Sequence, residues 1–378
     1  MPWQEVKAGF PLRLYQQTNE MRKAKGTLSS SYAELTPMSW LIEKDPSLRE
    51  RIEGFGGGYS PIFGGEDLRV AIAHHTGVEP DQVIVTNGID DALPSIYEAI
   101  LETGDVVSVL GPTYSPIPDR LVRSGATVAM VPFEREDEDL AENTLRALFT
   151  NEIAACVLNV PYNPVGWYPD EQSRNSIIDL ADATDTWIIA DEVYAGLPQQ
   201  EGTEAPSLAS LSDRIISVGS LTKTFGLPGL RIGWIICKDR EIIERIKNVR
   251  TFGHCYVSAL SEMAAIVTLN HAEELIKSKT SISCKNLATL RKVIDKCEFL
   301  SASYPEHGTV CMAKLDTKAS SFRSASEMCQ QLLVERGLIL VDNSFFNDNE
   351  NWVRFGFGMS AFGPMLKEFE SFLQNRKA

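Results

Sequence analysis

No stretch of this sequence is apolar over the about 18 residues that suggest a membrane-spanning helix. The first thirty residues also contain no apolar run as long as that of a signal peptide. The five histidines show neither H-x-x-x-H nor H-E-x-x-H spacing, so we predict no metal site. The seven cysteines are scattered without a C-x-x-C pair, which argues against a disulfide scaffold. These absences favour a soluble, cytoplasmic protein with reduced thiols.

Positive charge is also scarce. The chain has 36 Lys and Arg against 51 Asp and Glu, a net charge of −15, which disfavours nucleic acid or an anionic membrane as a partner. Any anionic small molecule must therefore be bound by a few local basic groups. The 378 residues, with 43% hydrophobic and 23% charged, are typical of a globular protein with two or three compact units.

Short apolar runs alternate with amphipathic helical patterns between about residues 50 and 250. The helical patterns include Ala92–Leu101 and Glu171–Ala183. The runs that we expect to be buried strands are Gln82–Val85, Val106–Leu110, Thr127–Val131, Ala154–Leu158, Trp187–Ala190, Ile215–Val218 and Ile232–Cys237. Buried strands that alternate with helices form parallel sheets covered on both faces. We therefore predict an α/β fold with a mostly parallel seven-stranded sheet in a large domain of residues 50–250.

The rest of the chain predicts a smaller α+β domain. Residues 251–378 begin with a linking helical region, Ser258–Val293, and continue with strands near Val310–Lys314, Leu338–Val341 and Trp352–Phe357. The N-terminal residues 1–49 are expected to join this smaller domain.

Two polar motifs follow predicted strands, at the edge where open α/β sheets bind ligands. The first leads through Gly88 into a helix, where free N–H groups at Ile89 and Asp90 are able to bind an anion. An ordinary turn capped by Asp90 is the alternative. The second contains Asn163, whose backbone is held extended by the following proline so that its amide can face a ligand. This pattern is also a common turn.

An acid and a lysine at further strand ends indicate specific chemistry. Asp191 ends an apolar run, and a buried acid needs a positive partner, either a protonated pyridine nitrogen or a structural ion pair. Lys223 lies between a buried strand and a Gly/Pro-rich turn that leads to Arg231. A partly desolvated amine near positive charge has a lowered pKa, which suits a Schiff base, whereas an exposed loop lysine is the alternative. Tyr114 is either a platform for an aromatic cofactor or a plain loop residue.

The order and spacing of these motifs resemble those of fold-type I pyridoxal-5′-phosphate (PLP) enzymes, and in particular the class I/II aminotransferases. The motifs are Asn163-Pro-Val-Gly, Asp191-Glu-Val-Tyr194, and Ser220-Leu-Thr-Lys223 through Arg231-Ile-Gly-Trp. The resemblance covers nearly the whole chain, from Gly57 to Gly356. It implies the PLP-dependent transferase fold, PLP as cofactor, and a homodimer that acts on an amino acid.

The resemblance also implies catalytic roles. Lys223 would bind the cofactor as a Schiff base and then move the proton at the substrate Cα. Asp191 would pair with the pyridine nitrogen, and Asn163 and Tyr194 would donate hydrogen bonds to the phenolic oxygen. Tyr114 would stack on the ring.

The remaining implied contacts concern the phosphate and the substrate. The phosphate would meet the backbone at Gly88, Ile89 and Asp90 together with Ser220, Thr222 and Arg231. Tyr59 would reach the phosphate in the neighbouring subunit. Arg354 would bind the substrate α-carboxylate with Asn163 nearby, since a guanidinium matches a carboxylate with two N–H bonds.

Two departures from the family pattern bear on function. An acid at Asp90 is unfavourable beside a phosphate, so only its backbone is expected to contribute. The N-terminal segment Leu28–Leu35 contains a serine run similar to that of capreomycidine synthase, a relative that cyclises a hydroxylated arginine. Glu34, with Tyr32, Tyr256 and His254 as further candidates, is expected in the substrate pocket, where an acid would suit a cationic substrate.

Two reactions therefore stay open. An aminotransferase that yields a 2-oxo acid is the main prediction, and elimination, replacement or cyclisation, for instance of an arginine derivative, is the alternative. A PLP-binding module without activity is disfavoured because Lys223, Asp191 and Arg354 are all present.

Overall fold

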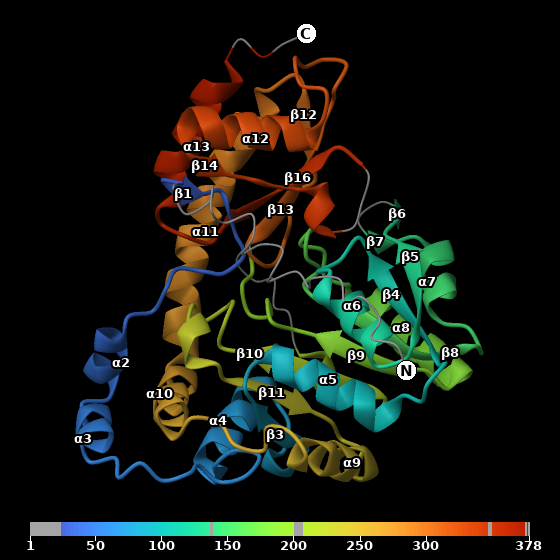
Figure 1. The fold of residues 1–378 in the computed structure, drawn as a ribbon, viewed down its shortest axis with the longest axis vertical. Helices are drawn as coiled ribbons and strands as arrows, with labels where there is room; N and C mark the ends of the chain where they lie inside the picture. Colours follow the sequence, from blue (N-terminus) through green and yellow to red (C-terminus); the bar gives the residue numbers. More distant parts are fainter. Residues whose placement is uncertain (1–23, 137–138, 200–206, 347–349, 375, 377–378) are drawn as a thin grey trace, which may run out of the picture.

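The large sheet follows the predicted pattern (Figure 1). The computed structural model describes residues 24–136, 139–199, 207–346, 350–374 and 376. The seven strands, in sheet order, are β3 (Val83–Thr86), β11 (Gly233–Ile236), β10 (Ile215–Ser220), β9 (Trp187–Asp191), β8 (Ile153–Asn159), β4 (Val106–Gly111) and β5 (Thr127–Pro132). In this sheet β11 runs in the opposite direction to the other six strands. The predicted mostly parallel seven-stranded sheet is confirmed.

Helices cover both faces of this sheet, because its central strands bury side chains alternately on either side. On one face, Ile84 of β3 packs with α5 (Ile89–Ile100), α6 (Pro116–Arg123) and α9 (Arg240–Thr251). On the other face, Val83 and Val85 pack against the helix α4, while the far half of the sheet meets α7 and α8. These three helices span Glu66–Thr76, Glu142–Leu148 and Glu171–Thr184.

A second, mixed sheet forms the core of the smaller domain. Its strands are β12 (Leu300–Ala302), β13 (Val310–Leu315), β16 (Trp352–Phe357), β15 (Val341–Asp342) and β2 (Ser29–Ser30). It packs with α11 (Ala272–Asp295), α12 (Ala325–Arg336) and α13 (Phe362–Leu373) around one buried cluster. The predicted strand Leu338–Val341 is divided in two, because β14 (Leu338–Ile339) pairs with β1 (Gly26–Thr27) whereas β15 pairs with β16.

The linking region is two helices rather than one. It divides at His271 into α10 (Ala259–Asn270) and the long α11, which rises from the large domain to the smaller one (Figure 1). Short elements complete the chain, namely a β6–β7 pair (Arg135–Glu136 and Asp139–Leu140) and 3-10 turns at Pro80–Gln82, Leu208–Ser210, Pro228–Leu230 and Asn343–Phe346.

The N-terminal segment contacts both domains. Its strands β1 and β2 join the smaller domain, whereas α2 (Met38–Lys44) and α3 (Ser47–Glu53) pack on α10 through Leu41 and Leu48. Residues 31–36 therefore cross between the domains. The domain boundaries themselves stay a prediction.

Features typical of membrane-spanning helices and of metal-binding sites are not found in the described residues. No helix in the described ranges has the length and apolar character needed to span a membrane. The same ranges contain no group of three or more His, Cys, Asp or Glu side chains arranged to bind a metal ion.

Candidate active site

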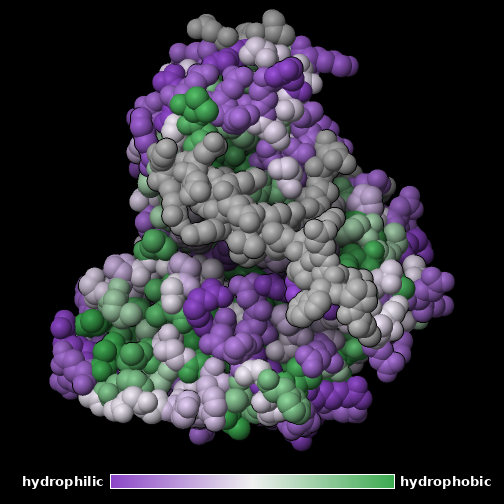
Figure 2. Space-filling model, in the orientation of Figure 1, coloured by the Kyte–Doolittle hydropathy of each residue, from purple (hydrophilic) through white to green (hydrophobic). Residues whose placement is uncertain are grey.

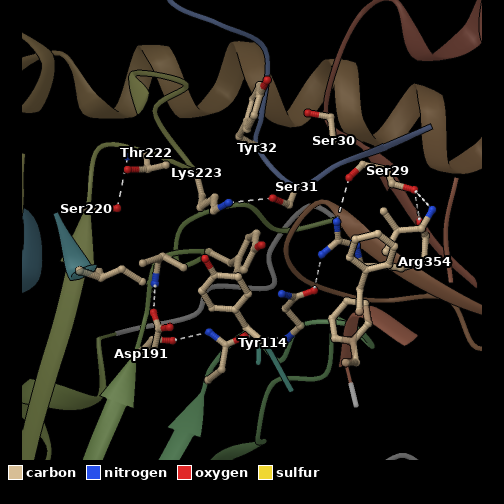
Figure 3. Close-up of a pocket in the computed structure, with 18 of the residues that line it drawn as sticks. Ser29, Ser30, Ser31, Tyr32, Tyr114, Asp191, Ser220, Thr222, Lys223 and Arg354 are labelled. Carbon is tan, nitrogen blue, oxygen red and sulfur yellow. Dashed lines mark hydrogen bonds between the residues drawn. The ribbon is translucent and has the colours of Figure 1, made fainter. Parts of the chain in front are cut away.

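A pocket of about 470 Å³ lies where the carboxyl ends of β8, β9 and β10 face the smaller domain. Its volume is that of a small-molecule site. The predicted site residues that line it are Ile89, Asp90, Tyr114, Asn163, Asp191, Tyr194, Ser220, Thr222, Lys223, Arg231 and Arg354. Residues from both domains and from the N-terminal segment thus meet around one cavity (Figure 3).

Lys223 extends into the centre of this pocket from the loop after β10 (Figure 3). Its Nζ donates a hydrogen bond to Ser31 Oγ at 2.7 Å and lies 5.9 Å from the centre of the Tyr194 ring. Burial, with the positive charge of Arg354, lowers the pKa of the Lys223 amine to about 8, although Asp191 acts in the opposite direction. At pH 7 an amine with this pKa is in the neutral, nucleophilic form in about a tenth of the molecules, far more than an ordinary lysine.

Asp191 is buried at the end of β9, beneath the lysine. Its Oδ1 accepts a 3.3 Å hydrogen bond from Val193 N, and its backbone oxygen accepts one from Asn159 Nδ2 at 2.9 Å. Burial raises the pKa of the Asp191 carboxyl to about 7. Among the described residues no Lys or Arg forms an ion pair with Asp191, so a cationic ligand group would meet an unpaired carboxyl there.

The anion-binding end combines the N-terminus of α5 with Arg231. Gly88 precedes the helix at a φ of +82°, and a Cβ atom there would lie 2.7 Å from Arg231 Nη2, so glycine permits the close approach. The hydroxyl of Ser220 and the side chain of Thr222 line the same end. The helix N-terminus and the guanidinium together suit a phosphate.

The Asp90 side chain pairs with basic groups beside this anion-binding end, and the expectation that only its backbone meets the phosphate stays a prediction. Its carboxylate pairs with Arg231 at 3.2 Å and with Arg120 at 2.6 Å. Two arginines therefore offset one acid, which is why a carboxylate is tolerated beside an anion site.

Arg354 occupies the opposite end, on β16. Its Nη1 donates to Asn163 Oδ1 at 3.0 Å, its Nη2 donates to Ser29 O at 2.8 Å, and its Cζ lies 5.4 Å from the centre of the Phe346 ring. The side chain is buried, and its Nε has no hydrogen-bond partner among the described residues. A buried guanidinium without an acidic partner is suited to an anionic ligand.

Two aromatic rings complete the pocket. The ring of Tyr114 lies in the middle of the cavity below Lys223 (Figure 3), where burial raises the pKa of its phenol strongly. Burial also raises the pKa of Tyr194, whereas Arg354 and a hydrogen bond with Ser31 act to lower it.

Two predicted residues lie away from the pocket. The Glu34 carboxylate accepts a hydrogen bond from Ser360 N, and Glu34 is not among the lining residues. Its contact is therefore an anchor for the N-terminal segment rather than part of the pocket wall. Tyr59 is 88% exposed and stacks on Tyr256 at 4.8 Å, also outside this pocket.

Of the further substrate-pocket candidates, Tyr32 lines the cavity, whereas His254 and Tyr256 line a separate surface hollow beside α5. Several lining residues were not predicted. Asn159 follows an apolar run directly, which was a usable signal; Ser31 stood in a serine run without an assigned role, and no local pattern indicated Phe346.

Comparison with known proteins decides the family. A model of the aminotransferase class I and II family matches residues 43–362. The chain belongs to this family. Capreomycidine synthase from Streptomyces vinaceus is 26% identical over 343 residues, which cover 89% of this chain and 86% of the synthase. Aspartate aminotransferase from Thermotoga maritima is 25% identical over 330 residues, 84% of each chain.

Solved structures of two PLP-dependent proteins share the fold. A PLP-dependent aminotransferase from Streptococcus suis 89-1591 matches with a TM-score of 0.89 at 24% identity, covering 99% of this chain and 100% of that one. The PLP-dependent cyclase OrfR matches with a TM-score of 0.86 at 26% identity and 99% coverage of both chains. The predicted family and fold are confirmed, and the chain is a PLP-dependent aminotransferase-family enzyme.

The family implies PLP, and the residues of the pocket fit this cofactor. Asp191 offers a buried, unpaired carboxyl to a pyridine nitrogen, and Lys223 offers an amine of lowered pKa to an aldehyde. The N-terminus of α5 and Arg231 offer an anion site to a phosphate. Arg354, whose Nε has no hydrogen-bond partner among the described residues, is then available to bind a second anion.

Proposed function

We propose that the protein is an aminotransferase that converts an L-amino acid to a 2-oxo acid, with PLP bound covalently to Lys223. The observation that carries the proposal is a cavity in which a buried acid, a lysine of lowered pKa and a buried arginine occupy three separate positions, and neither the acid nor the arginine has an ion-pair partner among the described residues. PLP supplies an electron sink for the bond that breaks at the substrate Cα.

Arg354 binds the substrate α-carboxylate in this proposal. Its position is fixed by Asn163 and by the backbone oxygen of Ser29, so the guanidinium is oriented before the substrate arrives. An oriented donor loses less entropy on binding than a mobile one. Lys223 lies between Arg354 and the end of the pocket that Ser220 and Thr222 line (Figure 3), so a carboxylate held by Arg354 would bring the substrate Cα toward the lysine.

Lys223 moves the proton in this proposal. Its amine would accept the proton from Cα and deliver it to C4′ of the cofactor, which lies two bonds from Cα, and this needs a base with a pKa near the working pH. A pKa of about 8 meets that need. Asp191 keeps a proton on the ring nitrogen, which favours the flow of electrons away from Cα.

We further propose a homodimer in which Tyr59 reaches the phosphate of the neighbouring active site. Tyr59 and Ile62 are 88% and 53% exposed between α3 and α4. Met38 of α2 and Val70 of α4 are also exposed, and hydrophobic groups reach the surface at the lower left of Figure 2. Such exposed groups are typical of surfaces that bind a partner.

The test is an absorbance titration of the PLP-loaded protein with single L-amino acids, combined with assay for a released 2-oxo acid. Transamination leaves the substrate amino group on the cofactor, so the visible band is lost and one equivalent of 2-oxo acid appears. If no amino acid in the panel gives a 2-oxo acid while one still perturbs the visible band and returns a different product, transamination is excluded.

Cyclisation, elimination or replacement is the second candidate. Two observations favour it: the similarity to capreomycidine synthase and to a PLP-dependent cyclase, and the serine run that brings Ser31 to Lys223. In that case the band returns after each turnover. The product of cyclisation or replacement retains its amino group, whereas elimination releases that group as ammonia together with a 2-oxo acid. Because Glu34 lies outside the pocket wall, a cationic substrate has no support from that residue.

A further inference from the structure

The N-terminal segment is fastened to the loop that holds Lys223. Ala33 N donates to Lys223 O and Thr36 N donates to Gly226 O, both at 3.0 Å. A Cβ atom at Gly226, where φ is +62°, would collide with the carbonyl oxygen of Glu34, so the two segments lie in direct contact. Glu34 O also accepts a hydrogen bond from the buried Lys279.

The other end of this segment is held against β16, the strand that carries Arg354. Ser29 Oγ donates to Arg354 O at 2.6 Å and accepts from Val341 N at 2.8 Å, and Ser30 pairs with Phe357 in the sheet. Ser31 follows directly. Its position is therefore fixed from both sides, between the carboxylate-binding arginine and the lysine.

The Ser31 hydroxyl lies beside the Lys223 amine, above the Tyr114 ring (Figure 3). It accepts the 2.7 Å hydrogen bond from Lys223 Nζ, and it faces the Tyr194 phenol closely enough to act to lower the pKa of that phenol. A hydroxyl has one donor and two acceptor positions, so it can serve both partners at once. The lysine amine, by contrast, ends a flexible four-carbon stem with rotatable donors and needs an external contact to hold one direction.

We propose that Ser31 is a positioning residue for Lys223: its hydroxyl, with Tyr194, holds the ε-amine on the substrate side of the pocket whenever the amine is not bonded to the cofactor. This proposal rests on the proposed function, since it assumes that Lys223 is the base that moves the Cα proton. A base displaced by about 1 Å loses about two orders of magnitude in rate. The serine run of the N-terminal segment thus acquires a role in setting where the proton is delivered.

The first test uses the cofactor-free protein and PLP itself as the probe. The rate at which PLP attaches to Lys223 is measured by stopped-flow absorbance as a function of pH, and the midpoint of the profile reports the ionisation of the amine. Because a hydrogen bond to the charged amine stabilises it, Ser31→Ala is expected to lower this midpoint by about one pH unit. Ser31→Thr keeps the hydroxyl and is expected to keep the midpoint.

Ser30→Ala is the matched control. It removes a hydroxyl from the adjacent residue, and Ser30 Oγ has no hydrogen-bond partner among the described residues. Its midpoint is expected to equal that of the wild type. Ser31→Cys keeps the size of the side chain but accepts hydrogen bonds weakly, so it carries the same expectation as Ser31→Ala if the latter does not fold.

The second test follows proton transfer without complete turnover. PLP-loaded protein is incubated in D2O with a mixture of the common L-amino acids, and loss of each Cα–H signal is followed by NMR. Ser31→Ala is expected to slow this exchange by about 10- to 100-fold with little change in KM, since it misplaces the base but leaves Arg354 intact.

A wild-type midpoint and a wild-type exchange rate in Ser31→Ala would overturn the proposal, as would an equal shift in Ser30→Ala. The proposed function and the role of Ser31 can be contradicted separately. If Lys223→Ala still forms the lysine-bound PLP band, the proposed function is wrong; if it does not, and Ser31→Ala behaves as the wild type, only the role of Ser31 is wrong.

Discussion

Replacing Asp191 with asparagine should stabilise the cofactor-free protein and at the same time impair the loaded enzyme. The Asp191 carboxyl is 2% exposed, and its pKa is raised to about 7 by burial from an ordinary value near 4. Between pH 4 and 7 the folded chain therefore binds more protons at this site than the unfolded chain. Stability falls as pH rises through that window and stays low above it.

The size of the effect follows from the pKa. About three pKa units at about 1.4 kcal/mol each give about 4 kcal/mol as the cost of the buried charge above pH 7. Asparagine removes the charge, but its N–H groups lack an acceptor in the described surroundings, which costs about 1–3 kcal/mol. The net expectation at pH 8 is a gain of about 1–3 kcal/mol, which turns into a loss of about 1–3 kcal/mol near pH 4, where the buried carboxyl is protonated and only the cost of the asparagine remains.

The assay is thermal unfolding of cofactor-free wild type and Asp191→Asn at pH 4.5 and pH 8, repeated with PLP. With PLP bound, Asp191→Asn should be less stable than the wild type, because a buried charge pair loses one partner. For the same reason its activity should fall by about 100-fold or more. Glu192→Gln is the matched control. Leu208 N and the hydroxyls of Ser207 and Ser217 donate to the Glu192 carboxylate, so this change should destabilise the protein. A gain for Asp191→Asn that is equal at both pH values would refute the argument from charge.

Three further changes test separate parts of the site. Arg354→Lys should raise KM for the amino acid by about 10- to 100-fold, measured by steady-state kinetics, because a lysine cannot form the paired hydrogen bonds; an unchanged KM would place the carboxylate elsewhere. Asp90→Asn should tighten PLP binding several-fold in a fluorescence titration, since it removes a negative charge beside the phosphate and releases Arg231, and weaker binding would contradict this. Glu34→Gln should leave the ratio of kcat/KM for cationic and neutral amino acids unchanged within about twofold, because its carboxylate binds Ser360 N; a large change would return Glu34 to the substrate pocket.

The large sheet was predictable because its strands are buried on both faces. Each predicted apolar run corresponds to a strand, and the strands end on the polar residues that the site uses, such as Asp191 of β9 and Ser220 of β10. The local signal of a polar residue after an apolar run therefore located most of the pocket. Asn159, the last residue of β8, gave the same signal and was not recognised.

The features that could not be predicted from the sequence depend on contacts between residues far apart in the chain. Leu338–Val341 forms two strands because its halves pair with different segments, of which one is N-terminal. Glu34 is held by Ser360, and Ser31 reaches Lys223 only because both ends of its segment are fixed by other elements. Contacts between residues that lie 192 to 326 positions apart leave no periodic or local pattern that sequence inspection could detect.

The most direct test of the central claim is the visible absorbance of PLP added to the wild type, Lys223→Ala and Lys279→Met. Lys279 is a second buried lysine whose pKa burial lowers to about 8, so it controls for non-specific attachment. The account predicts a band of lysine-bound PLP in the wild type and in Lys279→Met, and none in Lys223→Ala. A band of normal intensity with normal turnover in Lys223→Ala would contradict it.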